Sequence, residues 1–124
     1  RQADALAGEV GSDLGRRLEQ VLTTGGGDAG ELVDGVGVVY REWKSQRVER
    51  VAWDHVVAAF AEGVLAASAK GTAMSWIVDD DGPCPDCDDN ALAGPLPAGE
   101  AYPTGQAHPP AHPGCRCLLA PAQA

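Results

Sequence analysis

HPGCRC, residues 112–117, places a histidine and two cysteines within six positions near the C-terminus of this 124-residue chain. The other two cysteines lie upstream in PCPDC, residues 83–87. A segment of roughly 40 residues with little to bury needs a disulfide or metal cross-link. The segment from Gly82 onward has few large apolar side chains: Leu92, Leu96, Tyr102, Leu118 and Leu119. The two cysteine clusters are therefore expected to determine how this part of the chain folds.

The spacing of the cysteines favours a metal site. Cys84 and Cys87 have the C-x2-C spacing at which two thiolates from one tight turn reach one tetrahedral ion. HPGCRC adds His112, Cys115 and Cys117. Zinc accepts four thiolates, or three thiolates and one imidazole, so five candidates compete for four places. We predict a structural zinc site made by four of these five residues, and which four remains open.

Three competing roles for the cysteines are less well supported. Two disulfides are disfavoured because the rest of the chain shows no sign of secretion. A dithiol redox site is disfavoured because CPDC leads into DDNALAG instead of a βαβ unit with a helix after the motif. A zinc deaminase would need a His-x-Glu upstream, but His55 is followed by two valines, so the catalytic acid/base is missing. We therefore predict a protein that is not an enzyme and has no catalytic residues.

Residues 71–124 are predicted to form a small, irregular β/loop domain. TAMSWIVD, residues 72–79, has the β-branched and aromatic content of a short strand. The proline-rich stretch that follows cannot stay helical for long, and residues 91–102 are expected to form an irregular hairpin. Asp86, Asp88 and Asn90 have part of a calcium-loop spacing but lack its later Gly and Glu, so we expect turn residues.

Residues 1–70 are predicted to form a helical arm. TTGGGDAG, residues 23–30, ends a first helix, and Asp28 with Glu31 resembles a capping box that starts the next. Whether residues 31–68 form one helix or two, with a bend near 44–46, stays open. Apolar side chains follow helical spacing in three stripes, and Trp53 and Val57 widen the third: Leu6, Val10, Leu14, Leu18, Val21 and Leu22; Leu32, Val36, Val39, Tyr40 and Trp43; Val48, Ala52, Val56, Phe60 and Val64.

The predicted fold class is therefore α+β and mainly helical. A helical hairpin or long-helix arm, residues 1–70, precedes a small irregular β/loop domain, residues 71–124, stapled by a metal. The net charge of -9 would repel a nucleic-acid duplex, which argues against sequence-specific nucleic-acid binding. The chain has no run of about 18 apolar residues for a membrane span and no signal peptide, so we expect a soluble, intracellular protein without a membrane partner.

The stretch REWKSQRVERVAWD, residues 41–54, is the one local surplus of bases. Tryptophan and arginine are common anchors at protein interfaces. We predict that Trp43, Arg47, Arg50 and Trp53 bind a protein partner. The alternative is that both tryptophans pack on the first helix while the bases stay in water, and the sequence does not decide between the two.

The order of motifs resembles a known family. SWIVDDD, then CPDC, then LAGPLPAGEAYPTG, then HPPAHPGCRC is similar to the C-terminal region of the phage Mu F-like minor head proteins, also called the phage head morphogenesis family. The resemblance is strong over residues 72–119 and loose over the helices. CPxC followed, after a Gly/Pro-rich loop, by HPxCRC is far more specific than either half alone.

The resemblance implies a structural minor head protein of a tailed phage, acting in head assembly and in DNA packaging or delivery. It implies a place in the virion, and in the host cytoplasm during assembly. The implied partners are the portal or capsid protein, with a homo-oligomer around the portal as a further implication. The alternative is an intracellular zinc-binding module of a larger regulatory or nucleic-acid-processing protein.

Overall fold

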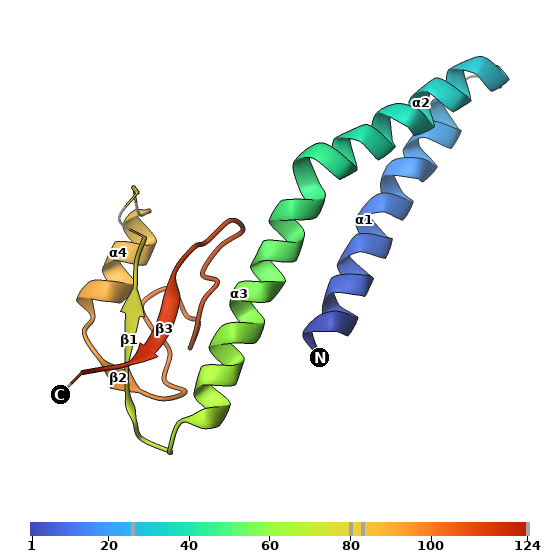
Figure 1. Ribbon diagram of the computed structural model, residues 1–124. Coiled ribbons are helices and arrows are strands. Elements are labelled where there is room, and N and C mark those ends of the chain that lie inside the picture. The colour runs from blue at the N-terminus through green and yellow to red at the C-terminus, as the bar shows by residue number, and fades with distance from the viewer. Residues whose placement is uncertain (26, 80, 83, 124) are drawn as a thin grey trace. The chain divides into compact units, whose positions relative to one another are not determined.

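The computed structural model describes residues 1–25, 27–79, 81–82 and 84–123 (Figure 1). The prediction of a mainly helical α+β fold is confirmed, and among the described residues no helix is long and apolar enough to cross a membrane. The elements follow one another as α1 (Gln2–Thr24), α2 (Ala29–Glu42), the π-helical segment η1 (Trp43–Arg47), α3 (Val48–Ala67), β1 (Ala73–Ile77), α4 (Pro85–Leu92), β2 (Leu96–Pro97) and β3 (Leu118–Pro121).

The chain separates into two compact units, Arg1–Ala52 and Trp53–Ala124. Most of α3 therefore belongs with the sheet, where it supplies one wall of the core. The division at residue 70 expected from the sequence marks the end of the helical pattern. That residues 1–70 and 71–124 form two separate domains remains a prediction.

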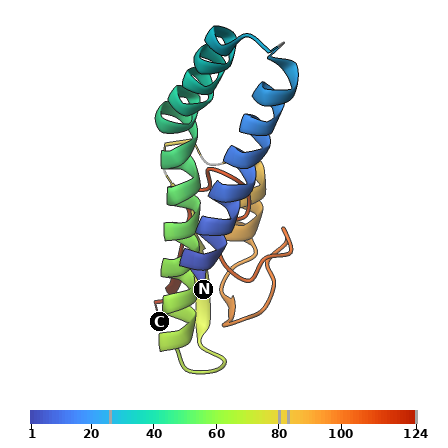
Figure 2. The same cartoon turned by 90° about the vertical axis from the view of Figure 1, so that its right-hand side faces the viewer.

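In the first unit, α1 and α2 lie side by side (Figure 1, Figure 2). Asp28 is the N-cap of α2, as predicted, and its carboxylate accepts a hydrogen bond from the Gly30 N–H at 3.1 Å. Gly26, in the helix-breaking stretch, lies outside the described residues. The two helices approach closely at Gly35, where an added Cβ would lie 2.7 Å from Cγ1 of Val21.

The backbone is helical without a break from Ala29 to Ala67, so the long-helix alternative holds. The position at which a bend was considered, residues 44–46, falls inside η1. A π-helical turn adds a residue to the helix and rotates the side chains that follow it. This rotation is a feature that a regular 3.6-residue period cannot predict.

The apolar stripes were only partly right. Val39 and Trp43 are buried, but Tyr40 is 65% exposed. In α3, Phe60 and its stripe neighbours Val48 and Val56 are exposed. The helix buries Val57, which was expected on the apolar face, together with Ala58 and Ala61, which were not. The reason is packing: α3 meets the core of the second unit through the small side chain of Ala61, flanked by Val64 and Leu65.

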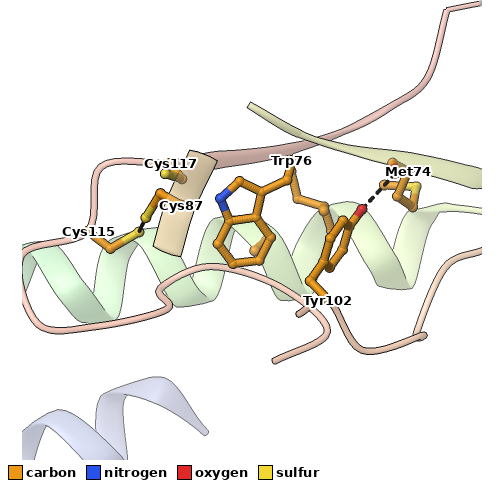
Figure 3. Packing of buried hydrophobic residues seen from close by; sticks show 8 residues of the cluster. Met74, Trp76, Cys87, Tyr102, Cys115 and Cys117 are labelled. Atoms are coloured by element: carbon orange, nitrogen blue, oxygen red, sulfur yellow. Dashed lines mark hydrogen bonds between the residues drawn. The ribbon is translucent and has the colours of Figure 1, made fainter. Parts of the chain in front are cut away.

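The second unit is built around an antiparallel three-stranded sheet in the order β2-β1-β3. The predicted strand is confirmed as β1, in which Met74 and Trp76 are buried on one face. Trp76 pairs in register with Leu119 of β3, which is also buried. Tyr102 packs on Trp76 with ring centroids 5.0 Å apart and donates a hydrogen bond from its hydroxyl to the Met74 carbonyl at 2.7 Å (Figure 3).

Two local predictions after β1 were wrong. Asp86, Asp88 and Asn90, expected as turn residues, lie in α4, because Pro85 at the start of the helix and acidic residues in its first turn favour a helix start. Residues 91–102 make no hairpin of their own, since β2 pairs with β1. Of the expected turn residues, Asn90 is fully buried. Its side chain is hydrogen-bonded to Thr104 and so connects α4 to the following loop, a role that the sequence spacing does not predict.

Candidate metal centre

The CPDC motif is positioned by the start of α4. Cys84 is the N-cap of this helix, and its Sγ accepts a hydrogen bond from the Cys87 N–H at 3.2 Å. Cys87 lies one turn inside the helix and is buried. Backbone N–H groups and the positive end of the helix dipole favour a negative sulfur at the N-cap. Local structure therefore prepares Cys84 to act as a thiolate.

The HPGCRC segment is held in place by contacts with the part of α3 that belongs to the same unit. The Gly114 N–H donates to the Asp54 carboxylate at 2.9 Å. The guanidinium of Arg116 lies 5.8 Å from the ring centroid of Trp53, a cation–π distance. Cys115 and Cys117, which flank Arg116 on either side, are both buried. The segment thus presents its two sulfurs inward and its arginine outward.

The two motifs meet although they are far apart in the sequence. Nε2 of His112 lies 3.1 Å from Sγ of Cys84 and 3.3 Å from Sγ of Cys87. Sγ of Cys87 lies 3.9 Å from Sγ of Cys115 (Figure 3). Ligand atoms lie within 4.8 Å of one another in two overlapping groups, Cys84–Cys87–His112 and Cys87–Cys115–Cys117. All five predicted residues are therefore brought together, with Cys87 shared by both groups.

The protonation of these side chains follows from their surroundings. Hydrogen bonding with Cys87 lowers the pKa of the Cys84 thiol. Burial raises the pKa of the Cys87 and Cys117 thiols. The hydrogen bond to the Pro113 carbonyl raises the pKa of His112. Without a positive ion among them, burial therefore favours the protonated thiols of Cys87 and Cys117.

His112 has the tautomer that a metal ligand needs. Its Nδ1 lies 3.0 Å from the Pro113 carbonyl oxygen, which can only accept a hydrogen bond. Nδ1 therefore carries the proton in the neutral ring, and Nε2 offers its lone pair toward the sulfurs of Cys84 and Cys87. Metal-binding histidines almost always use the second nitrogen in this way.

Three separations within the cluster match those of a tetrahedral site, although the ligand atoms form two groups of three and no four of them lie within 4.8 Å of one another. With metal–sulfur bonds of about 2.3 Å and metal–nitrogen bonds of about 2.0 Å, ligand atoms stand about 3.8 Å apart for two sulfurs and about 3.5 Å apart for sulfur and nitrogen. The observed 3.9 Å between the sulfurs of Cys87 and Cys115, and 3.1 and 3.3 Å to His112, are close to these values. The Cys/His cluster can therefore hold a metal ion.

The cysteines differ from those of a disulfide protein or a simple redox dithiol. All four are free thiols. The expectation that no helix follows CPDC was wrong, because the motif leads into α4. What separates this cluster from a simple dithiol is the presence of His112, Cys115 and Cys117 around the same two sulfurs.

The four predicted partner-binding residues are divided between the two units. Trp43 is buried, and its indole N–H donates to the Asp13 carboxylate of α1 at 3.3 Å. Arg47 forms an ion pair with the same carboxylate at 2.8 Å. Arg50 and Trp53 are exposed. Trp43 and Arg47 thus stabilise the first unit. Arg47 is exposed like Arg50 and Trp53, but its guanidinium is held by the Asp13 carboxylate.

Sequence reasoning missed the residues that support the cluster. Asp54 and Arg116 fix the HPGCRC segment, and Trp76 borders Cys117 in the core. A cavity of about 270 Å³ beside the cluster is lined in part by Asp79 and Asp81. The alternation of apolar residues in β1 predicts that Trp76 faces the core. Which residues it meets there, Cys117 among them, depends on the fold.

No protein-family model, curated protein or solved structure matches the chain.

Proposed function

We propose that the chain is a structural minor head protein of a tailed phage, whose C-terminal unit is stabilised by one zinc ion. In this role it acts at the portal vertex during head assembly and DNA packaging or delivery. The observation that carries the proposal is the convergence of CPDC and HPGCRC, the two halves of the motif that resembles the phage head morphogenesis family. Cys87 and His112 are 25 positions apart in the sequence, yet their ligand atoms lie 3.3 Å apart.

Zinc is the metal that suits this donor set best. Thiolates with or without one imidazole, in tetrahedral arrangement, are typical of structural zinc and unsuited to calcium or magnesium. Four protein ligands would fill the coordination sphere and leave no position for a substrate. Bound zinc would supply cross-linking energy, on the order of 10 kcal/mol in small domains, and no chemistry. This supports a structural protein in preference to an enzyme.

The need for such a cross-link is visible in the core of the second unit. Three of the eight buried residues of this core are cysteines, Cys87, Cys115 and Cys117. The long connection between β2 and β3 contains turns and no regular element. Apolar burial alone is small for a unit of this size, so a metal that joins α4 to the HPGCRC segment would contribute much of its stability.

The proposed partner is the portal or capsid protein, with copies of this chain arranged around the portal. Arg50 and Trp53 are the exposed members of the predicted docking set that the Asp13 carboxylate does not hold. Arg50→Glu reverses an exposed charge and should reduce incorporation into particles, whereas Arg50→Lys keeps the charge and should restore it. Arg47 is unsuitable for this test, because its ion pair with Asp13 makes its replacement destabilise the first unit.

The proposal is tested by locating the protein. Particles purified from an infected host and digested for mass spectrometry should contain the chain, in a low copy number relative to the major capsid protein. If the protein is found only in the host cytoplasm, bound to replication or repair proteins, this would instead support the alternative of an intracellular, regulatory zinc-binding module. Incorporation of Arg50→Glu at the level of the parent would place the docking surface elsewhere.

A further inference from the structure

The indole of Trp76 carries a buried polar group without a partner. Among the residues that the structure describes, its Nε1–H is the one buried side-chain nitrogen or oxygen that lacks a hydrogen bond. The ring is held firmly, because it packs on Tyr102 and lies opposite Leu119 in the sheet. Native proteins rarely leave a buried donor unpaired, so such a group indicates an acceptor that is present only in another state.

The sulfur of Cys117 is the natural acceptor. The nitrogen edge of the indole faces the cysteine cluster (Figure 3). Trp76 is a neighbour of Cys117, and both side chains belong to the same buried cluster. A neutral thiol is a weak acceptor. A thiolate is a far stronger one, since bonds to charged acceptors are shorter and stronger.

We infer that Trp76 is a positioning residue of the metal centre, whose indole N–H donates a hydrogen bond to the Cys117 sulfur when that sulfur is a metal-bound thiolate. The inference rests on the proposed zinc site and goes beyond it in two respects. It makes Cys117 one of the four ligands among the five candidates. It also links the metal to the sheet, because Trp76 belongs to β1.

The physical effect would be twofold. A hydrogen bond to a ligating sulfur disperses its negative charge and fixes its direction, and loss of such outer contacts typically weakens metal binding by 10- to 100-fold. Metal binding would in turn satisfy the buried donor. Zinc binding and the packing of the Trp76–Tyr102 pair would therefore be coupled.

The test replaces the N–H without changing the shape of the ring. In the full chain, Trp76 is replaced by β-(3-benzothienyl)alanine, in which sulfur takes the place of the indole N–H. The matched control makes the same replacement at Trp43, whose N–H donates to Asp13 in the first unit. Zinc release to a chromophoric chelator is followed for both variants and for the parent protein.

We expect zinc to leave the Trp76 variant roughly 10-fold faster than the parent. The Trp43 variant should release zinc at the parental rate. In the ¹⁵N-labelled parent, the indole proton of Trp76 should shift downfield when zinc is added, and with ¹¹³Cd in place of zinc it should couple to the metal nucleus through the sulfur.

Parental release from the Trp76 variant, with no shift of its indole proton in the labelled parent, would overturn the inference and leave the zinc site intact. Full zinc retention by Cys117→Ser would also overturn it, because Cys117 would then not be a ligand. A parent protein that binds no zinc would overturn the proposed function as well, so the two failures are distinguishable.

Discussion

Asn90 offers the sharpest test of how the metal centre is supported. Its side chain is 0% exposed. Its amide donates to the Thr104 hydroxyl at 2.8 Å and its carbonyl accepts from the Thr104 N–H at 3.1 Å. Each of these bonds contributes about 1 kcal/mol net, and a buried group left unpaired adds to the loss. We expect Asn90→Ala to lower the free energy of unfolding by about 2–3 kcal/mol.

The substitution should also affect the metal, because Asn90 and Cys87 lie on the same short helix, α4. A helix that is no longer tied to the loop at Thr104 should hold Cys84 and Cys87 less firmly, so zinc release should accelerate. Unfolding is followed by urea denaturation at a fixed free zinc concentration, because bound ligand shifts the apparent stability.

Asp89→Ala is the matched control, since Asp89 is an exposed residue of the same helix and lies outside its first turn. Exposed substitutions of this kind usually change stability by no more than about 0.5 kcal/mol. If Asn90→Ala is no less stable than Asp89→Ala, the Asn90–Thr104 bridge does not stabilise the unit. If it is less stable but releases zinc at the parental rate, α4 and the metal site are not coupled.

Two further predictions concern the helices. Gly35→Ala should lower the free energy of unfolding by about 1–3 kcal/mol, because its Cβ would lie 2.7 Å from Val21. Gly63→Ala, whose Cβ would meet nothing within 4 Å, should raise it by up to about 1 kcal/mol. Equal effects of the two substitutions in thermal denaturation would refute the close helix packing. Burial raises the pKa of Asp13, but Arg47 outweighs this effect, so the pKa of this carboxyl lies below its unfolded value of 3.8. The ionised carboxylate therefore stabilises the fold at pH values above 3.8, and this contribution is lost as the pH falls through the lowered pKa. Asp13→Asn should therefore be less stable than the parent near neutral pH and equal to it in strong acid; a difference that persists in acid would contradict the ion pair.

The parts of the fold that depend on local pattern were predictable from the sequence. The first helix, the Asp28 cap and the β1 strand each follow from spacing or from a single capping side chain. The five metal-ligand candidates were also identified, because C-x2-C and HPGCRC are short, dense motifs. Their mutual distances could not be predicted, since they depend on a connection of many residues between α4 and β3.

The parts that depend on packing were not predictable. The buried face of α3 is set by small side chains such as Ala61, which a search for large apolar residues overlooks. Helix α4 was missed because its start is capped by a cysteine, Cys84, which is not one of the usual capping residues. Asn90 read as a turn residue because its burial depends on Thr104, which lies 14 positions away.

The most direct test of the zinc-stabilised metal centre is the mass of the intact native protein. The chain is purified under reducing conditions without added metal and measured by native mass spectrometry, alongside Cys115→Ser. The account predicts one zinc ion per parent chain, and a Cys115→Ser variant that has lost both the ion and the order of its C-terminal unit. A parent chain without zinc, carrying four reduced thiols and a C-terminal unit that remains folded, would contradict it.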